Sequence, residues 1–132
     1  MKNRVLGVLL IAMSLVAYTP AAVAHHSFAA EFDSEKPITI RGNVTKIAWG
    51  NPHVWVYLNV KDDKGQVMNW GFEMGAPQQV RAQGWDRTTL KTGDEIVVDG
   101  FSARDGSKRM NARNVTWAAT GKKLGAASSS GR

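Results

Sequence analysis

The stretch His53–Met74, HVWVYLNVKDDKGQVMNWGFEM, decides the fold, because apolar and polar residues alternate on both sides of Asp62-Asp63-Lys64-Gly65. Such alternation is typical of strands with one buried face, and the four-residue segment suits a type I turn followed by a left-handed glycine. The turn pairs Asp62 with Gln66 and so sets the register. Four apolar residues of the first strand then face four of the second: Val54, Val56, Leu58 and Val60 face Met74, Phe72, Trp70 and Met68. The stretch predicts an antiparallel hairpin whose buried face a one-residue slip would destroy.

The opposite face of this hairpin collects aromatic and polar side chains. The register places Tyr57 opposite Gly71, Trp55 opposite Glu73, and His53 diagonal to Glu73. An aromatic ring over a cross-strand glycine protects the bare backbone. The residues of this face are Trp55, Tyr57, Asn59, Asn69 and Glu73. We expect it to be the more exposed side of the hairpin.

The segments around the hairpin complete the plan of a small barrel. From Pro37, a β-rich stretch switches the parity of its apolar residues near Gly42 or Lys46, which indicates a bulge or bend. Residues 76–84 have proline at the start and glycine at the end, as a short helix does. Two more strands are expected, at Glu95–Phe101 and Arg109–Trp117. This order predicts an all-β fold: a small five-stranded OB-like Greek-key barrel with one short helix between strands three and four. The alternatives are another small β-barrel, or a sandwich in which the helix is a loop.

The N-terminal residues read as a secretory signal peptide, residues 1–24. Two basic residues precede the apolar run Val5–Ala17, and Ala22-Val23-Ala24 has small residues where signal peptidase cuts. Cleavage after Ala24 makes His25 the first residue, whereas cleavage after Val23 would place His26 third. We therefore expect a periplasmic protein without a membrane span after cleavage.

Composition limits what the remaining residues can form. They suffice for one small domain and divide into an N-terminal arm (25–36), the barrel (37–119) and a tail (120–132). The tail has too few large apolar residues to fold, so we expect it to be disordered. The chain has 17 Lys and Arg against 11 Asp and Glu, which favours an acidic partner or surface, or serves solubility alone. The absence of cysteine excludes disulfides, c-type haem attachment and thiolate metal sites.

The expected new N-terminus carries groups that bind metals. The α-amine and imidazole of His25 can chelate one ion, and the imidazole of His53 would add a third nitrogen in a T-shaped set. Nitrogen donors in a tetragonal plane match Cu(II), so copper is the predicted cofactor, with His26 or Glu73 as a further ligand. The alternative is an arm that binds no metal and whose two histidines are merely its first residues.

A different class of function uses the aromatic face instead. On OB-folds this face is the usual ligand surface, so Trp55, Tyr57, Asn59 and Asn69 would bind an exported partner protein or a small ligand. The alternative is a purely structural role, in which the rings of Trp55 and Tyr57 cover Gly71 and pack under the arm, against Phe28 and Phe32. We expect no nucleic-acid partner, because an exported protein rarely meets single strands.

Signatures of catalysis are missing. Ser27 beside His26 is adjacency in sequence rather than a catalytic triad, and no glycine-rich segment has the strand–loop–helix context of a phosphate-binding loop. We therefore predict that the protein is not an enzyme.

Several short motifs carry a resemblance over nearly the whole mature chain. They are His25-His26-Ser27-Phe28, Asn51-Pro52-His53-Val54-Trp55, Trp70-Gly71-Phe72-Glu73, Gly84-Trp85 and Leu90-Lys91-Thr92-Gly93-Asp94. With them the chain resembles a family of small exported proteobacterial proteins of unknown function. The resemblance implies that the histidine pair and the Asn-Pro-His segment belong to the family pattern, and it implies no activity.

Overall fold

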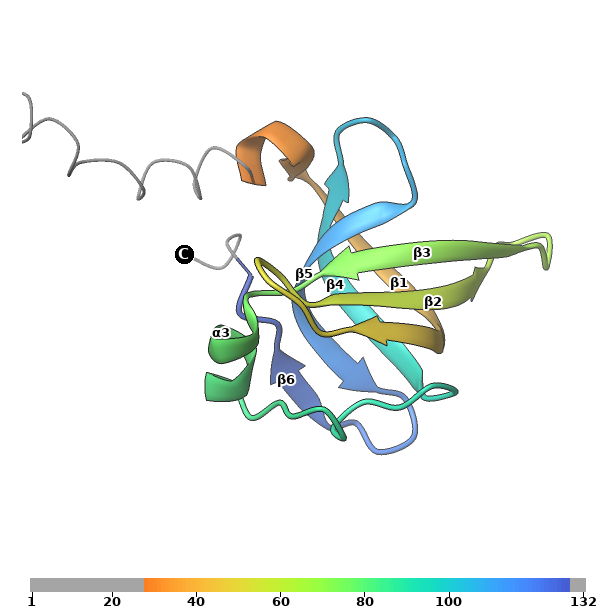
Figure 1. Ribbon diagram of the computed structural model, residues 1–132. Helices are drawn as coiled ribbons and strands as arrows, with labels where there is room; N and C mark the ends of the chain where they lie inside the picture. Colours follow the sequence, from red (N-terminus) through yellow and green to blue (C-terminus); the bar gives the residue numbers. More distant parts are fainter. Residues whose placement is uncertain (1–27, 129–132) are drawn as a thin grey trace, which may run out of the picture.

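The computed structural model describes residues 28–128 and shows a β-rich fold (Figure 1). Its elements are β1 (Phe32–Ala48), β2 (Trp55–Lys61), β3 (Val67–Glu73), α3 (Pro77–Ala82), β4 (Glu95–Ala103), β5 (Arg109–Trp117) and β6 (Lys123–Gly125). A single helical turn, residues 28–31, precedes β1. The helix α3 begins at Pro77, as the sequence predicts, and Gly84 just beyond its end adopts a φ of 95°.

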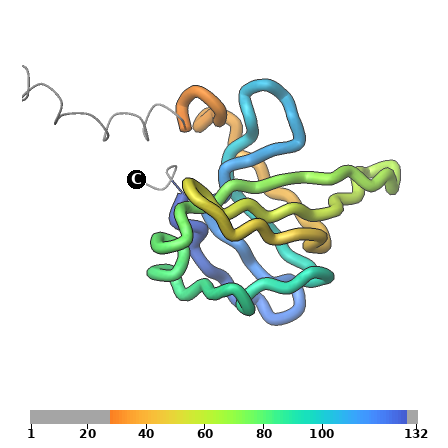
Figure 2. The backbone as a smooth tube through the Cα atoms, viewed as in Figure 1, coloured from red at the N-terminus to blue at the C-terminus, as the bar shows by residue number. Residues whose placement is uncertain are grey.

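Five of the strands close into a barrel (Figures 1 and 2). The hydrogen-bonded order is β3-β2-β1-β4-β5-β6, and a parallel pairing of β3 with β5 joins the two sides of the sheet. The ring therefore runs β1-β2-β3-β5-β4 and returns to β1, while β6 extends the sheet beyond β5. With α3 between β3 and β4, this is the predicted OB-like Greek-key barrel, enlarged by one strand.

The β2–β3 hairpin has the predicted register. Tyr57 pairs with Gly71 and Trp55 with Glu73, and Asp62 N–H donates to the Gln66 carbonyl at 2.9 Å. Gly65 takes the left-handed conformation, with a φ of 79°. The alternation of the sequence and the turn chemistry therefore suffice to specify this part of the fold.

The first strand bends as its change of parity predicts. The pairing of β1 with β2 shifts between Val44 and Lys46, which is the signature of a β-bulge. Gly42 lies on the approach to the bulge, and a Cβ there would be 2.2 Å from the Asn59 carbonyl oxygen. The close approach of these two strands therefore requires glycine at this position.

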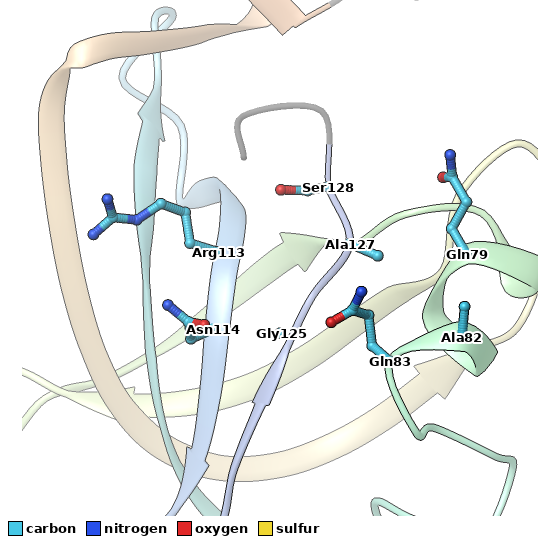
Figure 3. A pocket seen from close by; sticks show the side chains of 8 residues that line it. All are labelled: Gln79, Ala82, Gln83, Arg113, Asn114, Gly125, Ala127 and Ser128. Carbon is cyan, nitrogen blue, oxygen red and sulfur yellow. The ribbon is translucent and has the colours of Figure 1, made fainter. Parts of the chain in front are cut away.

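The tail expected to be disordered is ordered as far as Ser128. Residues 123–125 form β6 on β5. Ala126 N–H donates to the Arg113 carbonyl at 2.8 Å, and the Ala126 carbonyl accepts from Gly75 N–H at 2.9 Å. Figure 3 shows this segment passing between β5 and α3. The prediction was wrong because it counted large side chains: small residues allow a close approach, and backbone hydrogen bonds hold the segment.

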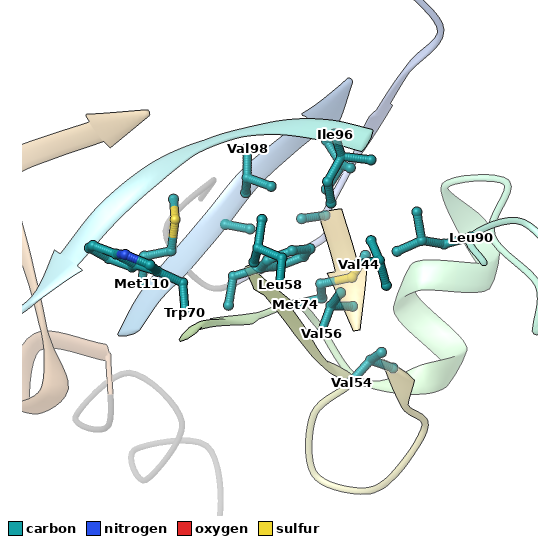
Figure 4. Packing of buried hydrophobic residues seen from close by; sticks show 14 of the residues in the cluster. Val44, Val54, Val56, Leu58, Trp70, Met74, Leu90, Ile96, Val98 and Met110 are labelled. Atoms are coloured by element: carbon teal, nitrogen blue, oxygen red, sulfur yellow. The ribbon is translucent and has the colours of Figure 1, made fainter. Parts of the chain in front are cut away.

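The core fills the barrel with the apolar face of the hairpin (Figure 4). Val54, Val56, Leu58, Phe72 and Met74 are each at most 1% exposed. The remaining members come mainly from β1, β4, β5 and α3: Ile40, Val44, Val80, Ile96, Val98, Met110, Ala112 and Val115. The expected pair Val60 and Met68 is only partly buried, because the turn end of the hairpin extends past the barrel in Figure 1.

The N-terminal arm joins the barrel earlier than expected. β1 starts at Phe32 rather than at Pro37. Phe28 stacks on Phe32, with ring centroids 5.9 Å apart, and meets the edge of Phe101 of β4 at 6.1 Å. The aromatic partners of Phe28 are therefore Phe32 and Phe101, and not the Trp55/Tyr57 pair that the sequence analysis considered.

Polar contacts anchor the helical turn to the β4–β5 hairpin. Arg104 donates from Nε to the Ala29 carbonyl at 2.7 Å, and its backbone N–H donates to the Glu31 carbonyl at 2.9 Å. The Glu31 carboxylate lies 4.0 Å from a guanidinium nitrogen of Arg109. Contacts with Arg104, Arg109 and Phe101 thus fix the helical turn against the barrel.

Candidate functional site

His53 and Glu73 meet at one end of the β2–β3 hairpin, as their diagonal placement predicted. The His53 Nδ1 atom lies 3.2 Å from Glu73 Oε1. Glu73 is the last residue of β3 and is buried, with 7% of its surface exposed, whereas the His53 side chain remains 31% exposed. The carboxylate is therefore enclosed by the fold, and the imidazole lies between it and solvent.

Burial changes the protonation of both groups. It raises the pKa of the Glu73 carboxyl to about 7, and the nearby Glu31 carboxylate adds to this rise while the Arg109 guanidinium opposes it. Burial also lowers the pKa of His53 below its ordinary value, against the opposing effect of Glu31. Both shifts disfavour charge on the pair.

Asn111 of β5 lies beside Glu73 on the same side of the sheet. The two residues are partners in the parallel β3–β5 pairing, next to the pair Phe72 and Met110, whose side chains are both in the core. Because side chains alternate along strands, Glu73 and Asn111 point to the opposite face. Asn111 is completely buried, and neither polar atom of its amide has a hydrogen-bond partner among residues 28–128.

We name His53, Glu73 and Asn111 the junction cluster, because Glu73 contacts His53 and pairs with Asn111 where β3 joins β5. The arm lies close to this cluster, since Asn111 is also the antiparallel partner of Phe101, on which Phe28 packs. Sequence reasoning found two members and missed Asn111. The alternation in its strand was visible, but the pairing that brings it beside Glu73 joins distant segments.

The other predicted metal ligands, His25 and His26, lie outside the described residues. Within residues 28–128, no group of three or more His, Cys, Asp or Glu side chains is close enough to hold a metal ion. Of the predicted ligands, the described barrel brings together His53 and Glu73.

The aromatic face has the predicted arrangement. Trp55 and Tyr57 stack with ring centroids 6.5 Å apart, and the Lys46 ammonium lies 5.7 Å from the centre of the Tyr57 ring. A Cβ on Gly71 would be 3.2 Å from the Tyr57 ring, so the ring covers this glycine closely. Both aromatic residues are half-buried.

The predicted asparagines of this face bind each other. Asn69 donates from Nδ2 to Asn59 Oδ1 at 3.3 Å. Both residues are exposed, on strands that pair directly. The pair extends the aromatic face toward the turn of the hairpin.

A separate groove of about 550 Å³ lies between α3 and the β5–β6 edge (Figure 3). Its lining mixes polar and apolar surface, and it is formed by Gln79, Ala82, Gln83, Arg113, Asn114, Gly125, Ala127 and Ser128. None of the predicted site residues lines it. Arg113 and Asn114 both contact Asp99, at 3.3 and 3.2 Å, so two of its polar side chains already have a carboxylate partner.

Comparisons with known proteins place the chain in a family without assigning it an activity. No curated protein matches it. Among solved structures, it is similar to the mitochondrial single-stranded DNA binding protein Rim1 of S. cerevisiae, with a TM-score of 0.49 and 13% identity over 63% of this chain and 94% of that chain. No helix in the described part of the chain has the length and apolar character needed to cross a membrane. The model of a family of unknown function (DUF6152) matches residues 12–112, and the chain belongs to that family.

Proposed function

We propose that this chain is a periplasmic, non-catalytic binding protein that holds copper. Cleavage after Ala24 frees the α-amine of His25, which binds the ion together with its own imidazole and the imidazole of His53. His26 is a neighbouring, secondary ligand. The observation that carries this proposal is the helical turn at residues 28–31, which contacts with Arg104 and Phe101 hold against the barrel.

The proposal requires the N-terminal residues to reach from the helical turn to His53. An extended chain covers at most about 3.6 Å per residue, so the three steps from Phe28 back to His25 can span at most about 11 Å. Phe101, Asn111 and Glu73 are successive neighbours on three strands, and neighbouring strands lie about 4.8 Å apart. The step from Phe101 to Glu73 is thus about 10 Å. The proposal therefore needs His25 to extend from the turn toward Glu73 and His53.

The donor set supports copper in particular. An amine and two imidazoles supply three neutral nitrogen donors, and a tetragonal arrangement of nitrogen donors suits Cu(II). The chain has no cysteine to offer a softer site. The imidazole of His53 is partly exposed, so an ion can reach it from solvent.

The test begins with the mass of the exported protein and continues with a Cu(II) titration of the same material, followed by EPR. The proposal expects a mature start at His25, one tight site, and nitrogen couplings that weaken in His53→Ala. One extra alanine before His25 displaces the amine and abolishes tight binding, whereas one extra alanine after Arg132 leaves it intact. A different start, or binding no tighter than that of a generic peptide, contradicts the proposal.

The stacked rings of the aromatic face favour a second candidate function. In it, the protein binds no metal, and Trp55 and Tyr57 dock an exported partner protein or a planar ligand. Aromatic residues that remain half-exposed are common anchors of such interfaces. Here Trp55→Ala abolishes partner binding and the extra residue before His25 has no effect, which is the reverse of the copper pattern.

A further inference from the structure

Two arginines converge on one tryptophan ring beside α3. Trp49 directly follows β1 and packs against the core while remaining partly exposed. The guanidinium carbon of Arg81, in the last turn of α3, lies 5.8 Å from the centre of this ring, and that of Arg87, in the connection to β4, lies 5.7 Å from it. Both arginines are exposed. We name these three residues the Trp49 cluster.

The two arginines of this cluster differ from the others that the structure describes. Each of the others has a carboxylate oxygen at 2.8 to 3.6 Å: Arg41 pairs with Glu95, Arg104 with Asp33, Arg109 with Asp105, and Arg113 with Asp99. Within residues 28–128, Arg81 and Arg87 have no carboxylate partner, and their side chains donate no hydrogen bond. The unpaired guanidinium groups of the described barrel therefore share one ring.

The acidic residues of the α3–β4 connection are engaged within the fold. Asp86 precedes Arg87, but its Oδ1 atom accepts from the backbone N–H and the hydroxyl of Thr88, at 2.6 and 2.7 Å. Asp94, at the other end of the connection, accepts from the Trp117 indole at 3.2 Å. The two positive charges on the ring repel each other, and a negatively charged partner from outside would relieve this repulsion.

The geometry of the cluster indicates which kind of anion fits. The attraction of a guanidinium group to an aromatic face uses none of its five N–H donors. These donors match the two oxygens of a carboxylate. The Trp49 ring is covered by guanidinium groups and packs partly against the core, so it offers little surface on which a nucleic-acid base could stack. Carboxylates therefore fit the cluster better than a single strand of nucleic acid does.

We propose that the Trp49 cluster is a docking site for an acidic segment of a partner protein, in which two neighbouring Asp or Glu side chains bind Arg81 and Arg87. Charge complementarity carries the choice of partner, since the chain has a formal net charge of +6 and these two arginines are left without carboxylates in the described fold. Tryptophan and arginine are also the residues that most often dominate protein interfaces. The site contains no residue of the proposed copper site or of the aromatic face.

Binding of fluorescein-labelled hexaglutamate, followed by fluorescence anisotropy with EDTA present, tests the proposal without reference to copper. We expect hexaglutamate to bind, more tightly at low than at physiological ionic strength, and hexaglutamine not to bind. Arg81→Gln and Arg87→Gln should each lower the affinity by about two- to fivefold, as the loss of an exposed ion pair does, and the double variant by more than either. If hexaglutamate does not bind at low ionic strength, the proposal is wrong.

Arg41→Gln is the matched control. It removes the same charge from an exposed arginine that already has a carboxylate partner, Glu95, at 2.8 Å. We expect the affinity of this variant for hexaglutamate to stay close to that of the parent protein. A loss as large as in Arg81→Gln would mean that binding follows the net charge of the protein, and this outcome overturns the assignment of a site.

NMR of the full chain locates the bound peptide. Hexaglutamate should shift the indole N–H signal of Trp49 and the Nε–H signals of Arg81 and Arg87, whereas hexaglutamine should leave them in place. Signals that stay in place during binding would put the peptide elsewhere and overturn the proposal. Inorganic phosphate and a thymidine oligonucleotide are titrated in the same way. If either shifts these signals at a lower concentration than hexaglutamate does, an acidic protein segment is the wrong occupant.

Discussion

A chain that ends at Thr120 should be markedly less stable than the full chain. The missing segment supplies acceptors for two buried donors of the barrel: the Trp85 indole donates to Gly125 at 2.8 Å, and Gly75 N–H donates to Ala126 at 2.9 Å. Ordering the segment costs entropy, which its pairing with β5 and the burial of Ala126 offset. The decrease in the free energy of unfolding on truncation is then set by the two buried donors, which no longer have acceptors. At about 1–3 kcal/mol for each, it amounts to roughly 2–6 kcal/mol.

Urea unfolding, followed by tryptophan fluorescence, measures this loss directly. For a small domain with an m-value of about 1–3 kcal/mol/M, even the lower figure moves the midpoint by about 1 M. A control chain that ends at Ser128 keeps all these contacts and should unfold with the full-length chain. If the chain that ends at Thr120 also unfolds at the same midpoint, the segment does not stabilise the barrel, and the reasoning is refuted.

Three further predictions concern single residues. In metal-free protein, the free energy of unfolding should fall as pH rises from about 4.5 to about 7, since the pKa of buried Glu73 is raised in the folded state. Glu73→Gln should flatten that part of the curve, and an unchanged slope would point to another group. Asn111→Leu should raise the stability of metal-free protein by about 1–3 kcal/mol in urea unfolding, because it removes a buried amide without partners among the described residues; a destabilised variant would show that the amide is satisfied. Gly42→Ala should lower the melting temperature markedly, because its Cβ would lie 2.2 Å from a backbone oxygen of the neighbouring strand. A melting temperature equal to that of the parent protein would mean that the two strands can separate at little cost.

The hairpin could be predicted from sequence because its information is local. The turn at Asp62 and Gly65 sets the register, and alternation over a few residues then assigns each side chain to a face. The contact between His53 and Glu73 follows from the same register, so this part of the candidate site could be predicted from the sequence alone.

The remaining features depend on contacts between distant segments. Asn111 joins the cluster through a parallel pairing of β5 with β3, which no periodicity in either strand specifies. The order of residues 123–128 depends on backbone hydrogen bonds, which composition does not reveal. The path of the arm was misjudged for the same reason, since Phe101 is close to Phe28 only after β4 has paired with β1.

The closure of the barrel has a consequence for how fast the protein folds. Phe32 pairs with Ala103 and Gly71 with Arg109, so the ring requires segments from both ends of the chain. Domains dominated by such non-local contacts fold in milliseconds to seconds rather than in microseconds. Until β4 and β5 are available, the apolar side of the β2–β3 hairpin lacks the core residues Ile96, Val98, Met110 and Val115. A nascent chain of this kind therefore stays unfolded for longer than one whose contacts are local.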